Sequence, residues 1–286
     1  MKIGVSTYCF WPLLKKGDYT IFDAIEYAKK TGFDAMDFTE LTPPPGKSES
    51  EYAEELGAAC RKAGIEAYAY TVGANFFADK SGDMSKETEK LKACVDIAKL
   101  LGASMMRHDI CWELDANSNC RSWQEVIAAV QGAVREIAEY AGGKGIKTMT
   151  ENHGLVLQNS TQLEALVRAV NHPNYGLLVD IGNFLCADES CLKAVVRLIP
   201  YAFHIHAKDF LYKSGMEPQP DDSWFHTKER NYLRGTILGH GAVSVAQCLE
   251  VIKKLGYKGC VTLEYEGLEE PLDAISRGFE FLKSRL

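Results

Sequence analysis

The sequence lacks the segments that would send a chain into a membrane or through a secretion route. No run approaches the roughly 18 apolar residues of a membrane-spanning helix. Met1 and Lys2 lead directly into IGVSTY, without the apolar core and cleavage site of a signal peptide. The nine cysteines are scattered and include no C-x-x-C pair, which disfavours a disulfide framework and a zinc ribbon. We therefore expect a cytoplasmic protein with reduced thiols.

Positive charge is also scarce. The chain carries 32 lysines and arginines against 39 aspartates and glutamates, which gives a net charge of −7. A surface with this balance is a poor general binder of nucleic acid or of anionic membranes, because both carry negative charge. We expect neither as a partner, and look for a small-molecule substrate instead.

A third absence bears on the fold. The first predicted strand is followed by STYCFWPLL and not by a G-x-G-x-x-G loop, which disfavours an open dinucleotide-binding sheet. Short apolar strands alternate with helical segments that often end at a glycine, and eight such units fit the 286 residues. The predicted strands are 2–8, 33–38, 65–70, 103–108, 146–150, 175–179, 201–210 and 260–264. The pattern predicts an α/β fold, a single (β/α)8 TIM barrel spanning 1–286.

One connection, 211–238, is much longer than the usual loop of a compact domain. It contains Trp224, Arg230 and Arg234, and it follows the strand with the most polar side chains. Long connections at the carboxyl ends of barrel strands often cover a substrate. We expect a lid, an interface within a homo-oligomer, or both.

Catalytic groups of a TIM barrel gather at the carboxyl ends of its strands. Four consecutive predicted strands each end in one residue of a metal-ligand type; these are Glu151, Asp180, His206 and Glu264. Ordinary ion pairing is the alternative, but three converging carboxylates repel one another unless a cation lies between them. Oxygen donors with one imidazole and no thiolate suit Mn²⁺, which we favour, or Co²⁺, Mg²⁺ or Zn²⁺. We predict one divalent ion per chain.

The segment 201–210, YAFHIHAKDF, predicts a strand with His204, His206 and Lys208 on one face. Histidines on such a face are often hydrogen-bonded core residues, so His204 carries no functional prediction. Lys208 is a candidate for stabilising a developing enolate, with a salt bridge to Asp209 as the alternative. His153, two residues after Glu151, is a candidate general base or a partner for a carboxylate.

A family resemblance rests on six short motifs in order: STY at 6–8, TENHG at 150–154, VDIGN at 179–183, HAKD at 206–209, GHG at 239–241 and LEYEG at 263–267. Together they resemble the xylose-isomerase-like barrels of the sugar phosphate isomerase/epimerase superfamily, over nearly the whole chain. The resemblance implies a metal on the four predicted ligands. It also implies that Glu151 and Glu264 move protons on opposite faces of a carbon next to a carbonyl.

The sequence departs from the epimerases of that group. Asn183 stands where they commonly have a histidine, and the arginine that follows their metal-binding histidine is not evident after His206. The H-x-K-D motif is more similar to inosose dehydratases and related metal-dependent lyases. These departures keep elimination open beside epimerisation.

We therefore expect a metal-dependent isomerase or epimerase that removes a proton next to the carbonyl of a sugar, keto-sugar or cyclitol. The alternative is a lyase that dehydrates an inosose or a 3-keto-glycoside. The predicted catalytic residues are Glu151, Glu264, His153 and Lys208, and the predicted substrate contacts are His108, Asn183, Asp209, Arg234 and His240.

Two other classes of protein share this barrel. A DNA-repair endonuclease needs more histidine and acidic ligands on the early strands and a basic surface. The early strand ends offer only Tyr8, Asp37, Glu40 and Thr71, and the chain is acidic. A barrel without catalytic activity is disfavoured because both Glu151 and Glu264 are present.

Overall fold

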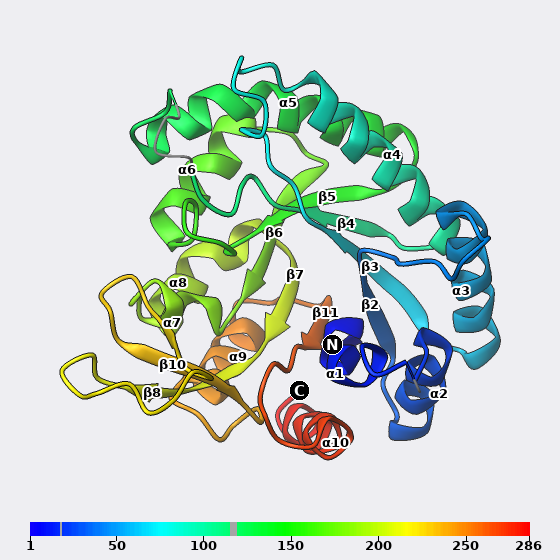
Figure 1. Cartoon of the computed structure of the whole chain (residues 1–286), viewed down its shortest axis with the longest axis vertical. Coiled ribbons are helices and arrows are strands. Elements are labelled where there is room, and N and C mark those ends of the chain that lie inside the picture. Colours follow the sequence, from blue (N-terminus) through cyan, green and yellow to red (C-terminus); the bar gives the residue numbers. More distant parts are fainter. Residues whose placement is uncertain (18, 115–118) are drawn as a thin grey trace.

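The computed structural model describes residues 1–17, 19–114 and 119–286. Eight parallel strands close into a barrel in the order β1-β11-β7-β6-β5-β4-β3-β2 (Figure 1). They are β1 (Lys2–Ser6), β2 (Ala35–Thr39), β3 (Glu66–Val72), β4 (Met105–His108), β5 (Lys147–Glu151), β6 (Tyr175–Asp180), β7 (Ala202–Ala207) and β11 (Cys260–Leu263). The predicted TIM barrel is confirmed, because β1 pairs with both β2 and β11 and leaves no open edge.

Helices surround the barrel on its outer side (Figure 1). The longer ones are α2 (Ile21–Thr31), α3 (Glu49–Ala63), α4 (Ser85–Leu101), α5 (Trp123–Gly143), α6 (Ser160–Val170), α8 (Cys191–Leu198), α9 (Val245–Lys254) and α10 (Pro271–Lys283). Short turns of helix are η1 (Thr7–Phe10), α1 (Trp11–Leu14), α7 (Asn183–Cys186) and η2 (Ile199–Tyr201). No helix among the described residues has both the length and the apolar character needed to cross a membrane.

Local sequence explains where several helices begin. Thr20 and Asp23 form a reciprocal capping box at the start of α2, and Ser48 and Glu51 form another at the start of α3. The strands lack strict polar alternation because both of their faces are covered; every residue of β6 is buried, for example. Side chains inside the barrel and between barrel and helices form the core.

The segment 201–210 is not one strand, contrary to the prediction. β7 ends at Ala207, and β8 (Asp209–Lys213) begins a separate three-stranded antiparallel sheet with β10 (Tyr232–Thr236) and β9 (Phe225–His226). The chain leaves the barrel at Lys208, whose side chain is buried among carboxylates. The long connection therefore contains a sheet of its own, which projects beside α7 and α8 (Figure 1).

Candidate metal centre and active site

The four predicted metal ligands meet at the carboxyl end of the barrel. Glu151 and Asp180 are the last residues of β5 and β6. His206 is the next-to-last residue of β7, and Glu264 directly follows β11. One ligand atom from each lies within 4.8 Å of the others, and none of the four residues is more than 9% exposed. Residues predicted separately on four strands thus form one buried cluster.

Asp180 is held in place by the backbone around it. Its Oδ1 accepts hydrogen bonds from the backbone N–H groups of Gly182 (2.7 Å) and Asn183 (3.0 Å). The buried side chain of Asn152 pairs with both backbone groups of Asp180, at 2.9 Å each, and so joins the ends of β5 and β6. This arrangement leaves Oδ2 of Asp180 directed into the cluster.

Glu151 is fixed by two partners. Its Oε2 lies 3.0 Å from Nε of the partly buried Arg107 on β4, and its Oε1 accepts a hydrogen bond from Nδ2 of Asn183 at 3.2 Å. Arg107 also pairs with Asp109 at 3.0 Å and donates to the backbone carbonyl of Val72. The guanidinium therefore occupies the Oε2 side of Glu151. Oε1 of Glu151 faces His206 and lies 4.0 Å from Nδ1 of that histidine.

Lys208 lies inside the cluster and does not pair with Asp209. Its Nζ is 2.5 Å from Oε2 of Glu264 and 3.3 Å from Oδ2 of Asp180. Burial alone would lower the pKa of Lys208, but these carboxylates raise it well above its usual value. Burial would likewise raise the pKa of Glu264, yet Lys208 and His206 hold it well below its ordinary range. The ammonium thus offsets part of the negative charge.

The donor atoms fit a divalent cation. Nδ1 of His206 is buried and has no hydrogen-bond partner among the described residues, and the buried Oδ2 of Asp180 has only the ion pair with Lys208 at 3.3 Å. Such atoms are costly unless another group satisfies them, and a cation in the cluster would do so. Three carboxylates and one imidazole are also the donor set that Mn²⁺, Co²⁺, Mg²⁺ and Zn²⁺ accept.

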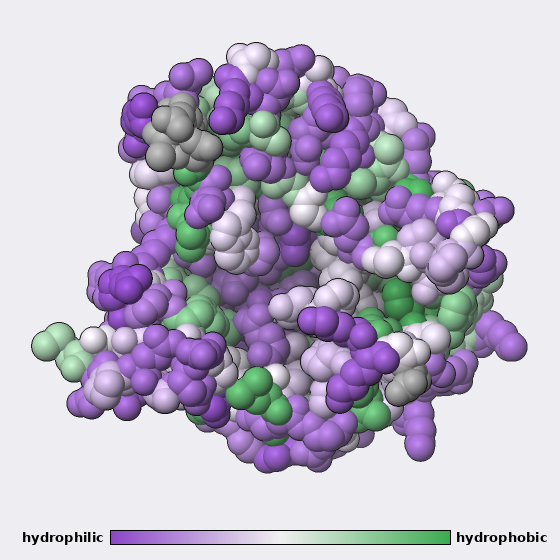
Figure 2. Space-filling model, in the orientation of Figure 1, coloured by the Kyte–Doolittle hydropathy of each residue, from purple (hydrophilic) through white to green (hydrophobic). Residues whose placement is uncertain are grey.

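His153 stands beside the cluster in the loop after β5. Its Nδ1 is 3.3 Å from Oδ1 of Asp109, and its ring meets that of Trp112 edge to face at 4.9 Å. Burial would lower the pKa of His153, but the hydrogen bond to Asp109 and the nearby Glu151 raise it. The side chain is 34% exposed, so a substrate can reach it. Figure 2 shows a recess with hydrophilic residues inside it in the middle of the face seen in Figure 1.

The structure brings one of the five predicted substrate contacts, Asn183, to the cluster, where it bonds to Glu151. Asp209 accepts hydrogen bonds from four backbone N–H groups, those of Phe210, Gly239, Gly241 and Val243. Oδ2 therefore holds the GHG segment, and Oδ1 bonds to Phe210 and to Val243 just after that segment.

The other three predicted contacts have partners elsewhere. His108 is fully buried beside the rings of Phe76 and Tyr175. The guanidinium of Arg234 lies over the ring of Trp224 at 5.2 Å within the β8–β10 sheet. His240 is exposed and lies 3.1 Å from the guanidinium of Arg277 on α10.

Three supporting residues were not predicted from the sequence: Asn152, Asp109 and Asp37. Asn152 and Asp109 lie inside motifs at strand ends, ENH and RHD, and the adjacency of β4 and β5 could have suggested that these motifs interact. Asp37 comes from β2, on the far side of the barrel, and carries no comparable local signal.

A model of the family described as "Xylose isomerase-like TIM barrel" matches residues 25–285. An inosose dehydratase of Glaesserella parasuis serovar 5 is 27% identical over 179 residues, which cover 58% of this chain and 54% of that protein. The chain thus matches about half the length of this curated relative.

Two solved structures are similar over the whole barrel. A D-allulose 3-epimerase from Methylomonas sp. has a TM-score of 0.75 at 19% identity, covering 100% of this chain and 98% of that one. The IOLI protein with a bound zinc atom has a TM-score of 0.75 at 19% identity, covering 99% of this chain and 97% of that one. At these identities the similarity establishes the fold.

Proposed function

Since the chain belongs to the family of xylose isomerase-like TIM barrels, we propose that it is a divalent-metal-dependent enzyme that removes a proton next to the carbonyl of a sugar, keto-sugar or cyclitol. One observation carries the proposal: Glu151, Asp180, His206 and Glu264 converge within 4.8 Å at the carboxyl end of the barrel. This is the end at which TIM barrels place their chemistry. Carbohydrate-modifying relatives support the substrate class.

The ion would be held by these four residues, and we favour Mn²⁺. When bound, it supplies Lewis-acid polarisation of a carbonyl and an adjacent hydroxyl oxygen. Lys208 would also stabilise negative charge that develops on the substrate oxygen. Its ammonium lies in the cluster, 2.5 Å from Glu264, and carries the opposite charge. Arg107 keeps Glu151 in one orientation and neutralises the carboxylate oxygen that points away from the centre.

His153 is the proton acceptor that the geometry supports best. Asp109, which bonds to Nδ1, orients the ring and stabilises its protonated form, so Nε2 is left for the substrate. Both glutamates are less suited to this role, because each already faces a cation: Arg107 on Glu151 and Lys208 on Glu264. For Glu264, Lys208 and His206 stabilise the ionised form and hold its pKa well below the ordinary range, which makes it a weak base.

With one acceptor outside the cluster, elimination of water is the outcome we favour. His153 takes the proton from the carbon next to the carbonyl, and its imidazolium returns that proton to the hydroxyl on the neighbouring carbon as the C–O bond breaks, so that one molecule of water leaves. Two curated relatives named inosose dehydratase support elimination of water as the outcome. Epimerisation or isomerisation is the second candidate, because Glu151 and Glu264 approach His206 from two sides, at 4.0 and 3.5 Å from its Nδ1.

The test is proton exchange in D₂O, followed by NMR, across ketoses, inososes and 3-keto-glycosides with Mn²⁺ or with chelator. An active lyase converts a substrate to a dehydrated product with loss of the C–H signal. An epimerase or isomerase incorporates deuterium without losing water. If no substrate in the panel exchanges its proton although the protein holds a divalent ion, the proposed proton abstraction is wrong.

A further inference from the structure

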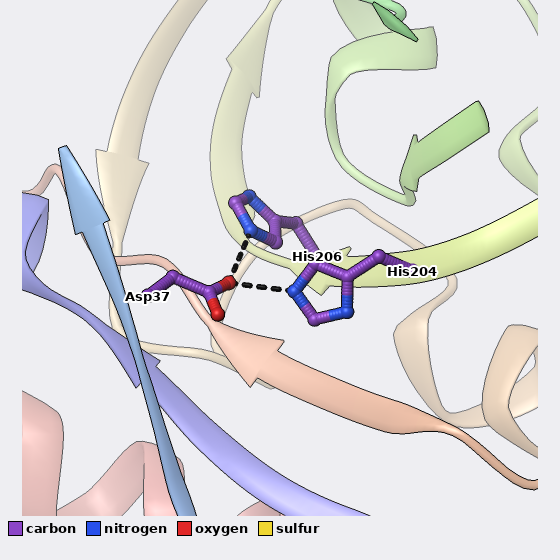
Figure 3. A group of neighbouring side chains, drawn as sticks. All are labelled: Asp37, His204 and His206. Atoms are coloured by element: carbon purple, nitrogen blue, oxygen red, sulfur yellow. Dashed lines mark hydrogen bonds and ion pairs between the residues drawn. The ribbon is translucent and has the colours of Figure 1, made fainter. Parts of the chain in front are cut away.

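A second buried group lies directly behind the candidate metal centre. Asp37 of β2 is fully buried, and its Oδ2 is 2.9 Å from Nε2 of His206 and 2.6 Å from Nε2 of His204 (Figure 3). The two histidines lie on the same face of β7, two residues apart, and both rings turn toward the one carboxylate oxygen. Nothing in the proposed chemistry uses Asp37 or His204.

The contact decides which nitrogen of His206 carries a proton. A carboxylate oxygen only accepts hydrogen bonds, so Nε2 of His206 must be the donor to Asp37. In the neutral ring Nδ1 then has a lone pair, and this atom is buried and lacks a hydrogen-bond partner among the described residues. It lies 3.5 Å from Oε1 of Glu264, on the side of the ring that faces the cluster. The ring therefore presents a ligand atom to the metal centre only while its proton stays on Nε2.

His204 completes the arrangement from the other side of Asp37. Its Nε2 also approaches Oγ1 of Thr262 at 3.2 Å, and its ring lies 4.8 Å from that of Tyr68. A fully buried carboxylate is costly unless several donors satisfy it. Both N–H donors reach Oδ2 of Asp37 and stabilise its ionised form, while Oδ1 is buried without a hydrogen-bond partner among the described residues.

We propose that Asp37 is a positioning residue that holds His206 with its proton on Nε2 and Nδ1 toward the metal centre, and that His204 acts through Asp37. This rests on the proposed function, because it assigns these residues a role toward a divalent ion. A metal-ligating histidine whose other nitrogen donates to a carboxylate binds its ion about 10–100-fold more tightly than one without that partner. The competing possibility is that the three residues hold a second ion, with His206 bridging two metals.

The experiment uses Zn²⁺ as a diamagnetic probe, with calorimetric titration of the metal and ¹⁵N NMR of the imidazole rings in the metal-free and loaded full-length protein. We expect one Zn²⁺ per chain, bound to Nδ1 of His206, with a proton on Nε2 of both His204 and His206. Asp37→Asn should weaken Zn²⁺ binding by about 10–100-fold. The amide can donate to Nε2 and so favour a proton on Nδ1. The matched control is Asp34→Asn. Asp34 lies at the opposite end of the barrel, where it accepts a hydrogen bond from the backbone N–H of Ile3. This variant should bind Zn²⁺ with the affinity of the wild type.

His204→Phe removes the donor and keeps a ring against Tyr68. It should weaken Zn²⁺ binding, and adding it to Asp37→Asn should cause no further loss, because both act through one contact. His206 bound through Nε2, two Zn²⁺ per chain, or an unchanged affinity in Asp37→Asn would each overturn the inference alone. A wild-type protein that binds no Zn²⁺ would overturn the proposed metal centre as well. If Asp37→Asn does not fold, the spectrum of the wild type decides.

Discussion

At the scale of single residues, the partners of the two glutamates separate the possible mechanisms. Glu151 is paired with Arg107 and Glu264 with Lys208, each through one carboxylate oxygen. Each glutamate thus has one oxygen taken up by a cation and the other toward His206 in the cluster, which is the arrangement of a ligand. His153 has the opposite character, because its partner is the acceptor Asp109 and its side chain is partly exposed. For this reason our proposal gives proton transfer to His153.

His153→Ala should reduce kcat by about 10²–10⁴-fold, the usual contribution of one acid–base group, and leave metal content unchanged. Asp109→Asn should reduce kcat by a smaller factor, because the ring remains but loses its acceptor. The matched control is His172→Ala: His172 lies in the turn before β6, where its Nδ1 accepts from the backbone of Asn174. The turnover rate of each of the three variants should be measured on protein whose metal content has been determined.

The opposite result would assign the chemistry to the carboxylates. If His153→Ala keeps wild-type C–H exchange while Glu151→Gln and Glu264→Gln lose it with metal still bound, the two-carboxylate route of an epimerase is correct. Metal content must be measured in each variant, because both glutamates are also candidate ligands.

The cluster of four candidate ligands could be predicted from sequence because each one lies at or next to the end of an apolar strand. A barrel places all such ends together, so strand prediction alone located them. Their partners could not be predicted in this way. Asp37 and His204 are 167 residues apart and meet only across the closed barrel. The surroundings of Asp209 could not be predicted for a related reason: it is a polar side chain at a strand end, and the backbone N–H groups that bond to it come from a loop about 30 residues later in the chain.

At the scale of elements, the break at Lys208 has the largest consequence. Apolar and aromatic residues recur as far as Phe210, so the sequence predicts one uninterrupted strand over 201–210. In the structure β8 turns away from the barrel and pairs with β10. The backbone N–H groups of Lys228 and Glu229 donate to the carbonyl of Cys186 and to Asp188, beside α7. The long connection 211–238, called the excursion from here on, is thus attached to α7, which follows the candidate ligand Asp180. This attachment favours a role of the excursion at the candidate metal centre.

A shortened excursion tests that role. Lys213 and Tyr232 are directly paired in the β8–β10 ladder, so an Asn-Gly turn can replace residues 214–231 and close a two-residue hairpin. If the excursion covers the substrate, KM should rise while the Zn²⁺ affinity stays at its wild-type value. Trp224→Ala in the full-length excursion should give part of the same effect, since Arg234 loses the ring beneath it. Unchanged kinetics with an altered oligomeric state, measured by light scattering, would make the excursion an interface.

At the scale of the whole molecule, the closed barrel places three carboxylates in one buried cluster, offset by Lys208 and Arg107. An ion that binds this cluster in the folded state and not in the unfolded chain stabilises the fold by mass action. At an ion concentration of 100 times Kd the gain is about 2.7 kcal/mol. For a chain of 286 residues, that gain corresponds to a rise in Tm of about 4–5 °C.

Mn²⁺ or Zn²⁺ should therefore raise the Tm of the chelator-treated protein, and the rise should disappear in His206→Ala and in Asp180→Asn. Asp180→Asn is the sharper variant, because its amide oxygen can still accept from the backbone of Gly182 and Asn183 while one negative charge is removed. Its metal-free Tm should equal or exceed that of the wild type, since repulsion within the cluster falls. Differential scanning calorimetry with and without ion measures both effects. If the wild type shows no metal-dependent rise, or if Asp180→Asn keeps the full rise, the four residues do not form the ion's binding site.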